Sequence, residues 1–420
     1  MMLKRGALLV SMFIAIVMLI IGCGKKKQCQ TILGSPVGYD MRKELSPSRL
    51  TIAMWDNSWL NMHHPAGVYE DWNKVLDELT ARGFNTIRIE TFPIIVAEMK
   101  TSGEKTRMFG KNPYDNWGFS TIDYPHNVPD ELVEFLTAVK NKKLHVILSS
   151  WGAGNQAKYA DRQTFWQAWE VTLDMLKEHN LLDIVMYVDL DQEFPYFSPM
   201  MAHLNELSKE KVVMESQLDA MEAAGRRDWA WNSAQMAFVK DYMTSSLNHF
   251  QKRYPSVRFT FSLTSFWKEV RAMKVPVDVL EVHTWLNLTQ LGVRTSFDPM
   301  AKDRNPANDY KAYMQQIRDM LHAKRPMLMK DMENQLKFAS EWSQEIAAPV
   351  VITEAWGPWW HMDHPDLEWQ WLFDWCDQCS EMSCQFPIWG ITPWNYSHPY
   401  WKNWTNIKWY QKINRRFLDS

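Results

Sequence analysis

Two short apolar stretches decide the fold of this chain, VMYVDLDQE at residues 185–193 and VVITE at residues 350–354. Each has the length and the β-branched content of a buried strand, and each ends in a glutamate, Glu193 or Glu354. The carboxyl ends of parallel strands meet at one edge of a sheet, so two such strands would bring both carboxylates to the same edge. The two stretches therefore predict a parallel sheet that carries a pair of acids at its rim.

Six further stretches complete a set of eight predicted strands, and segments of helical period lie between them. Strand alternating with helix favours a parallel sheet, and 420 residues are ample for a (β/α)8 TIM barrel, which needs about 250. The predicted strands are residues 50–55, 86–90, 145–149, 184–190, 258–263, 279–282, 350–354 and 388–392, and the predicted helices are residues 69–82, 131–142, 162–179, 234–253, 331–346 and 367–376.

Two connections are longer than ordinary loops, residues 195–231 after the fourth strand and residues 287–326 after the sixth. In a TIM barrel the loops that follow the strands build the active-site face. We therefore expect both long loops to form walls of a cleft above the two glutamates.

Composition excludes some partners and favours others. The chain has 46 basic and 49 acidic residues and a net charge of -3, so it lacks the positive field that nucleic-acid binding requires. Its 23 tryptophans are unusual, and tryptophan faces pack against the apolar faces of sugar rings while the indole N–H bonds a hydroxyl. Burial in a large core is the alternative for each of them. We expect a monomer with a carbohydrate partner.

The first two dozen residues have the pattern of a processing signal and are not expected to be part of the folded domain. Lys4 and Arg5 precede an apolar stretch at residues 7–21, and the tetrapeptide Ile20-Ile21-Gly22-Cys23 resembles the lipobox of bacterial lipoproteins. A plain membrane anchor is the alternative. The resemblance implies a signal peptide at 1–22, lipid attachment at Cys23, a tether at 23–46 and one barrel domain at 47–420. It places the domain in the bacterial cell envelope, lipid-anchored to a membrane and facing outside the cytoplasm.

Four other cysteines remain, Cys29, Cys376, Cys379 and Cys384. The last three have two gaps of the kind seen in zinc sites, but no fourth ligand of matching spacing lies nearby. A disulfide or free buried thiols fit the pattern better. Because no glycine-rich phosphate loop is present either, we expect neither a metal nor a cofactor.

A pair of glutamates at one barrel rim suits glycoside hydrolysis, in which one acid protonates the leaving oxygen and one carboxylate attacks the anomeric carbon. The apolar residues 194–197 that follow Glu193 would favour its protonated form, as a proton donor requires. Glu354 would stay ionised if it lies near Arg88. A solvent-facing or salt-bridged acid is the alternative for each glutamate taken alone.

With these residues in place, the chain resembles a clan A glycoside hydrolase of the cellulase-like, family-five type over residues 50–417. The resemblance implies a retaining enzyme for β-linked glycosides or polysaccharides, with Glu193 as acid/base and Glu354 as nucleophile. It assigns Arg88 to contact with the nucleophile, and His283 and Trp394 to the substrate site.

Three departures from the family pattern stand out. Gln192 replaces the asparagine that precedes the acid/base, Trp285 replaces a tyrosine after the sixth strand, and the histidine expected after the third strand is absent, with Trp151 nearby. These changes keep a second hypothesis open, a catalytically silent carbohydrate-binding lipoprotein on the same barrel.

Other residues at strand ends complete the predicted site. Trp55 and Asp56 follow the first strand and Trp356 follows the seventh, and all three are expected to bind substrate. Glu90 and Glu281 lie at the rim too, and we expect them to pair with Arg88 rather than to bind sugar.

Overall fold

The structure is a computed structural model that describes residues 45–111, 122–151, 161–198, 200–207, 230–286, 306–358, 363, 368–394 and 397–420, with the side chains of 306–310 left aside. The expected signal peptide, Cys23, Cys29 and all of the tether before residue 45 lie outside these residues. Of the helices that the structure describes, none is both long and apolar enough for a membrane crossing.

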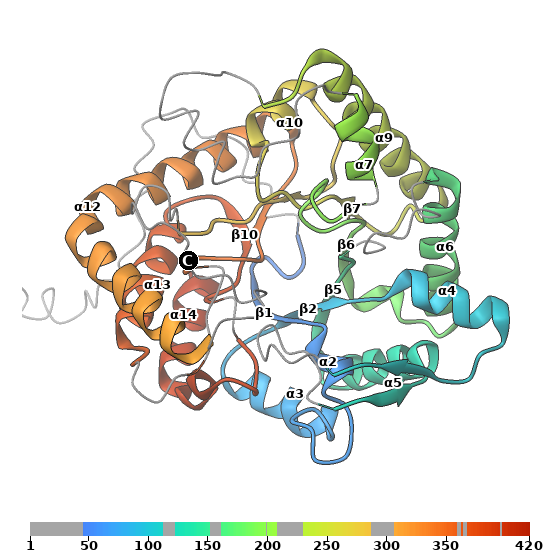
Figure 1. Ribbon diagram of the computed structural model, residues 1–420, viewed down its shortest axis with the longest axis horizontal. Coiled ribbons are helices and arrows are strands. Elements are labelled where there is room, and N and C mark those ends of the chain that lie inside the picture. Colours follow the sequence, from blue (N-terminus) through green and yellow to red (C-terminus); the bar gives the residue numbers. More distant parts are fainter. Residues whose placement is uncertain are drawn as a thin grey trace, which may run out of the picture.

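A barrel of parallel strands forms the centre of the molecule (Figure 1). The strands are β1 (Leu50–Asp56), β2 (Thr86–Glu90), β5 (His145–Ser149), β6 (Val185–Asp189), β7 (Phe259–Thr260), β8 (Leu280–Glu281), β9 (Val350–Ile352) and β10 (Ile388–Ile391), and their order in the sheet is β7-β6-β5-β2-β1-β10-β9-β8. A parallel bridge between Leu263 and Val282 joins the two edges, so the barrel is nearly closed. The predicted (β/α)8 TIM barrel is confirmed, with all eight strands in the predicted places.

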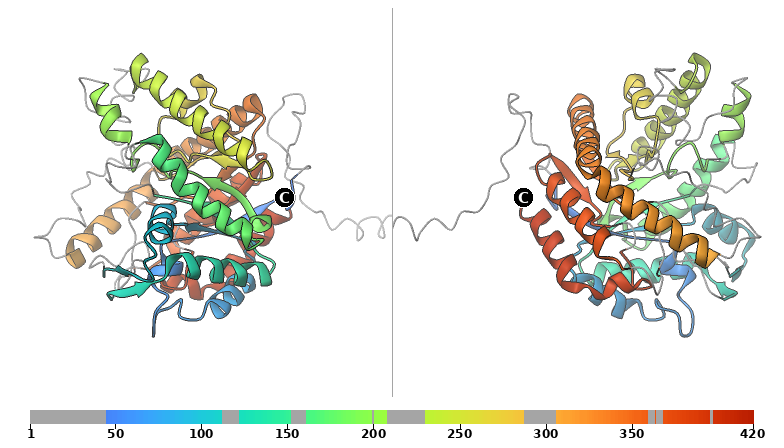
Figure 2. Two further views of the ribbon diagram at one scale, coloured as in Figure 1. Left: turned by 90° about the vertical axis from the view of Figure 1, so that its right-hand side faces the viewer. Right: turned by 60° about the vertical axis from the view of Figure 1, so that its left-hand side comes forward.

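Helices form a ring around the strands, as Figure 1 shows. They are α3 (Trp72–Ala81), α4 (Pro93–Ser102), α5 (Val128–Asn141), α6 (Arg162–Glu178), α9 (Ser233–Arg253), α10 (Trp267–Met273), α12 (Pro306–Ile346), α13 (Gln370–Ser383) and α14 (Ile407–Leu418), with the short helices α2 (Ser58–Asn61) and α7 (Met200–Glu206) after β1 and β6. A two-stranded antiparallel sheet of β3 (Arg107–Phe109) and β4 (Tyr124–His126) follows α4. Figure 2 shows α12, α13 and α14 side by side on one flank.

The loop predicted at residues 287–326 is partly wrong, because α12 begins at Pro306 and runs for 41 residues through Pro326. Pro326 lies inside this helix, although proline disfavours a helix interior. Tertiary packing outweighs that preference here, since Ile317, Leu321 and Leu328 are buried on either side of the proline.

Local signals explain where several helices begin. Asp71, Asn127 and Asp161 each accept a hydrogen bond from a backbone N–H of the first turn of α3, α5 and α6. Asn232 and Gln235 form a reciprocal capping box at the start of α9. These caps fix where the chain turns from each barrel loop into the outer ring.

The barrel has two apolar layers, one inside the strands and one between strands and helices. Leu50 and Ile52 of β1 belong to the inner cluster, whereas Ala53 and Trp55 belong to the outer cluster that the helices share. The alternation follows from the two-residue period of a strand. It also decides which predicted site residues can face the barrel mouth.

Cys376 and Cys379 lie on α13 and Cys384 follows this helix, and all three are buried thiols that form no disulfide with one another. Free buried thiols were one of the two preferred alternatives. Burial raises the pKa of the Cys376 and Cys379 thiols well above the usual value, which makes them inert as nucleophiles.

Candidate active site

The barrel brings Glu193 and Glu354 together at the C-terminal ends of its strands. One carboxylate oxygen of each glutamate and one ring nitrogen of His283 lie within 4.8 Å of one another. The Nδ1 atom of His283 lies 2.9 Å from Glu193 Oε1 and 3.4 Å from Glu354 Oε2. The two acids from distant parts of the chain therefore share one site, with an imidazole between them.

The backbone around Glu193 is held in an unusual conformation. Glu193 has a φ of 50°, in the left-handed region that costs a residue other than glycine about 1–3 kcal/mol. Three consecutive N–H groups fix it: Gln192 N donates to Ser150 O at 2.7 Å, Glu193 N to Ser262 Oγ at 2.9 Å, and Phe194 N to Ser262 O at 3.0 Å. The neighbouring strand ends of β5 and β7 thus impose the direction of this glutamate.

Arg88 links the acids of the site from below. Its side chain is fully buried, donates to both carboxylate oxygens of Asp56 at 3.1 and 3.0 Å, and donates to Glu354 Oε1 at 2.5 Å. It also donates to Thr353 Oγ1 at 2.8 Å, and Thr353 in turn donates to Glu281 Oε1 at 2.5 Å. The predicted contact between Arg88 and Glu354 is present in the structure.

Burial and charge set the protonation of these groups. Burial lowers the pKa of His283, but Glu354, Glu193 and Glu281 outweigh it and raise the value to about 10. Burial raises the pKa of Glu354 to about 7, although His283 and Arg88 act in the opposite direction. His283 is therefore an imidazolium at neutral pH. The expectation that Arg88 keeps Glu354 fully ionised is too simple, because desolvation of the carboxylate is the larger effect.

Of the two glutamates predicted to pair with Arg88, Glu281 does so and Glu90 does not. Glu281 Oε1 lies 3.6 Å from Arg88 Nη1, as expected. Glu90 instead accepts backbone N–H groups of Phe92 at 2.7 Å and Trp151 at 2.5 Å, because it ends β2 beside two turning loops. Burial raises the pKa of Glu90 to about 8 in spite of these two bonds.

Gln192 and Asp191 are fully buried beside the acid/base candidate. Neither oxygen nor nitrogen of the Gln192 amide has a hydrogen-bond partner among the described residues. Burial raises the pKa of Asp191 to about 7, and Ser198 offsets part of the effect. An amide without partners costs free energy, so this position is suited to a role that a bound molecule would complete.

Three tryptophans predicted to bind substrate are packed in the core instead. Trp55 donates from Nε1 to Ser397 O at 3.1 Å, and Trp356 donates to Thr392 O at 3.1 Å, both without exposure. Trp394 is 1% exposed and packs on Trp369 and Phe373, with ring centroids 5.2 and 5.9 Å away. The prediction fails for Trp55 because it occupies an outward position of β1, and for Trp356 because it follows β9 and joins the outer cluster that the helices share. It fails for Trp394 because Trp369 and Phe373, at the start of α13, pack against this ring.

Trp151 and Trp285 remain partly exposed at the strand ends. Trp151 donates from Nε1 to Asp56 Oδ2 at 3.3 Å, and its ring meets Phe197 edge-on with centroids 5.0 Å apart. Asp56 was predicted to bind a sugar hydroxyl but here holds Arg88 and Trp151. Thr353 and Ser262 also belong to the site but were not predicted from the sequence. Thr353 adjoins Glu354 and was open to notice, whereas nothing in the sequence singles out Ser262.

Glu193, His283 and Glu354 form the one group of described residues that could together hold a metal ion. Metal binding needs a neutral imidazole, and here the carboxylates favour the protonated ring. Arg88 also already neutralises Glu354. The arrangement fits an ion-pair network in which His283 and Arg88 supply the positive charge.

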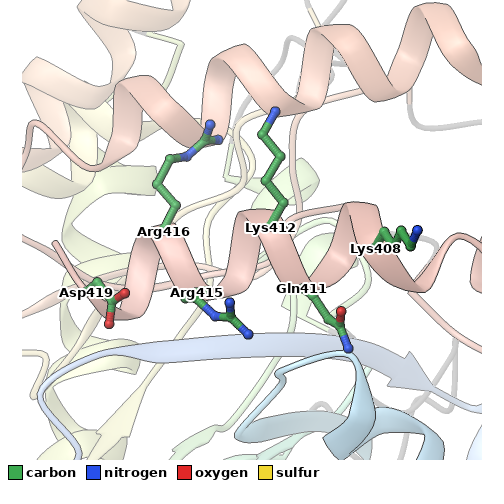
Figure 3. A pocket seen from close by; sticks show the side chains of 6 residues that line it. All are labelled: Lys408, Gln411, Lys412, Arg415, Arg416 and Asp419. Atoms are coloured by element: carbon green, nitrogen blue, oxygen red, sulfur yellow. The ribbon is translucent and has the colours of Figure 1, made fainter.

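A cavity of about 490 Å³ lies elsewhere, on the outer face of α14. Figure 3 shows the six side chains that line it, Lys408, Gln411, Lys412, Arg415, Arg416 and Asp419. None of them comes from a strand end, and Lys412 and Arg416 are paired with Asp377 of α13. This cavity is separate from the carboxylate site.

One of the solved structures compared with this chain supports the architecture. A protein from Parabacteroides distasonis described as a candidate glycoside hydrolase is 23% identical, with 88% of this chain and 93% of that chain covered and a TM-score of 0.70. A glycoside hydrolase family 5 mannosidase from Rhizomucor miehei is 10% identical over 88% of this chain and 94% of its own, with a TM-score of 0.48. Curated proteins gave no match.

The family model described as sugar-binding cellulase-like matches residues 52–418, which include the barrel from Ile52 of β1 onwards and both glutamates. The match confirms the cellulase-like resemblance that the strand-end motifs indicated. The chain belongs to the family of sugar-binding cellulase-like proteins.

Proposed function

We propose that this protein is a retaining β-glycosidase in which Glu354 is the nucleophile and Glu193 the acid/base. The observation that carries the proposal is the approach of the two carboxylates to within 4.8 Å between oxygens. Retaining enzymes hold their carboxyl groups about 5–5.5 Å apart, whereas inverting enzymes need about 6.5–9.5 Å to admit a water.

The surroundings divide the two roles. Glu193 keeps 13% of its side chain exposed and binds His283 through Oε1, which leaves Oε2 to carry the proton for the leaving oxygen. Glu354 is fixed by Arg88 through Oε1, which leaves Oε2 to attack the anomeric carbon. Cleavage transfers the Glu193 proton to the leaving group and forms a glycosyl ester on Glu354. A water then gives its proton to Glu193 and releases the sugar.

A mechanism-based label tests this proposal. A 2,4-dinitrophenyl 2-deoxy-2-fluoro-β-glycoside should add one sugar mass to the wild-type chain, at Glu354. Glu354→Gln should remove both labelling and turnover. Glu193→Ala should still form the glycosyl ester from this substrate, because dinitrophenolate leaves without needing a proton. Glu341→Gln, on the exposed face of α12, is the control. Labelling of Glu354→Gln at the wild-type rate would refute the assignment.

A catalytically silent sugar-binding protein is the second candidate. Gln192 favours it, because no described residue bonds the buried amide next to Glu193, and this side chain is longer than the asparagine of the family pattern. A panel of β-glucans, mannans, xylans and galactans separates the two functions. A binder would raise the melting temperature with one of these sugars and release no product.

We further propose that Cys23 carries a lipid that anchors the chain, as a monomer, to the bacterial cell envelope outside the cytoplasm. The lipobox-like residues 20–23 support this proposal. Cys23→Ser should move the protein from the membrane fraction to the soluble extract and abolish labelling by a fatty-acid analogue. Wild-type membrane retention in this variant would contradict it.

A further inference from the structure

We propose that Trp151 and Phe197 form an aromatic platform that binds a neutral, multi-unit sugar chain beside the two glutamates. The proposal rests on the glycosidase function above and specifies its substrate class. With Trp55, Trp356 and Trp394 packed away from the site, Trp151 is a partly exposed tryptophan that hydrogen bonds tie to the carboxylate network.

The position of Trp151 is fixed at both ends. Its backbone N–H donates to Glu90 Oε2 at 2.5 Å, and its indole Nε1 donates to Asp56 Oδ2 at 3.3 Å. Asp56 binds Arg88, and Arg88 binds Glu354. A chain of three hydrogen bonds thus connects this ring to the proposed nucleophile, with the side chains of Asp56 and Arg88 between the ring and Glu354.

Phe197 extends the same surface outwards. It is 48% exposed and is the one exposed phenylalanine, tyrosine or tryptophan among the side chains that the structure describes. Its ring stands at 84° to the Trp151 ring. Leaving a large aromatic in water is unfavourable, and sugar faces are what such rings bind in carbohydrate sites. Two neighbouring rings at the rim suit a chain that continues beyond the cleaved sugar.

The charge of the site selects for a neutral chain. Arg88 and His283 are the cations that the described salt bridges join to Asp56, Glu193, Glu281 and Glu354. With Glu193 protonated for its role as the acid, three carboxylates remain against two cations, so the network carries excess negative charge when Asp56, Glu281 and Glu354 are ionised. A uronate unit would bring a further carboxylate into this negative field, whereas a neutral sugar would not. We therefore infer that the substrate is a polymer of neutral hexoses or pentoses.

The test is equilibrium binding to the full chain made inactive by Glu354→Gln, with β-1,4-mannohexaose, cellohexaose and xylohexaose as neutral probes. Hexamannuronate is the anionic probe, because it has the mannohexaose backbone with added carboxylates. Calorimetry should detect binding of at least one of the neutral hexasaccharides and no binding of hexamannuronate. Adding Trp151→Ala or Phe197→Ala should weaken that binding by about tenfold, the change that about 1.4 kcal/mol produces.

Trp166→Ala is the matched control. Trp166 is also half-buried, donates from Nε1 to Ser246 and stacks on one ring, His249, but it joins α6 to α9 on the outer ring. Wild-type affinity in both Trp151→Ala and Phe197→Ala would overturn the platform. Tighter binding of hexamannuronate than of mannohexaose would overturn the neutral-substrate inference.

The same measurements distinguish failure of the platform from failure of the proposed glycosidase function. Hexaose binding that depends on Trp151 and Phe197, without hydrolysis by the wild-type chain, would support the platform and reject the glycosidase. Hydrolysis of an aryl glycoside without binding of any hexaose would retain the glycosidase and reject the platform. Because Phe197 is exposed, its substitution leaves the fold intact and keeps the test decisive if Trp151→Ala does not fold.

Discussion

The floor and the mouth of the barrel are built from the same strands but hold opposite kinds of side chain. The floor is an apolar cluster that includes Ile52, Ile147, Val279, Val351 and Trp389. The mouth holds the buried polar group Asp56, Arg88, Glu281, His283, Thr353 and Glu354.

The change occurs within two or three residues along a single strand. On β8 and its extension, Val279, Glu281 and His283 succeed one another on one face. The apolar floor supplies burial energy, and the ion-pair network above it costs desolvation energy that only good geometry offsets. Apolar burial and chemistry are thus separated by height in the barrel: a substitution in the mouth should change activity, whereas a substitution in the floor should change stability alone.

Arg88→Met should give the largest effect, because it removes the central cation of the mouth. Asp56, Glu354 and Glu281 would then be buried without their partner, which costs about 3–5 kcal/mol of unfolding free energy. Denaturant unfolding measures the loss, and turnover should vanish as well. Arg415→Met, at an exposed arginine of α14, should change the unfolding free energy by less than about 0.5 kcal/mol. An unshifted midpoint in Arg88→Met would show that the network adds no stability.

Asp191→Asn should stabilise the protein at alkaline pH by up to about 4 kcal/mol. Burial raises the pKa of Asp191 from 3.8 to about 7, so the unfolded chain ionises this group at a lower pH than the folded chain does. Its contribution to stability is present below pH about 4 and is lost as pH rises through about 7. Asparagine does not titrate, so the advantage of the variant should grow across that window.

Unfolding curves at pH 4 and pH 8 test this sign. Asp319→Asn, at a largely exposed aspartate of α12, provides the control. An equal effect of Asp191→Asn at both pH values would mean that the carboxylate is solvated in the folded protein.

His283→Gln should move the pH dependence of catalysis. In the wild type, kcat/KM should rise as pH passes about 7, because Glu354 must be ionised to attack and its pKa is about 7. The imidazolium holds that pKa down, so its removal should shift the rising limb upwards by about one pH unit. His249→Gln, at the outer surface beside Glu170, should leave the limb in place. A limb that stays near its wild-type position in His283→Gln would exclude the electrostatic role of this histidine.

Sequence reasoning located the strands and the two glutamates because strand length, β-branched content and period are local properties. It failed for Trp55 and Trp356, since a strand end does not reveal whether a side chain points into the barrel or towards the helices until the register is known. The bond between His283 and Glu193 and the support from Ser262 join residues 69 to 90 positions apart. Such contacts depend on barrel closure, which no local pattern encodes.

Ile147→Val should produce the smallest effect and the clearest contrast with the mouth. Ile147 is fully buried in the floor, and the loss of one methylene there costs about 0.5–1.5 kcal/mol of unfolding free energy. Because Ile147 is an apolar side chain of the floor and not one of the polar groups of the mouth, kcat/KM per folded molecule should equal that of the wild type, with an unchanged pH profile. Unfolding and kinetics on the same preparation measure both quantities. A fall in kcat/KM without a matching loss of stability would show that the floor positions the carboxylates through its packing, and the separation by height would then be wrong.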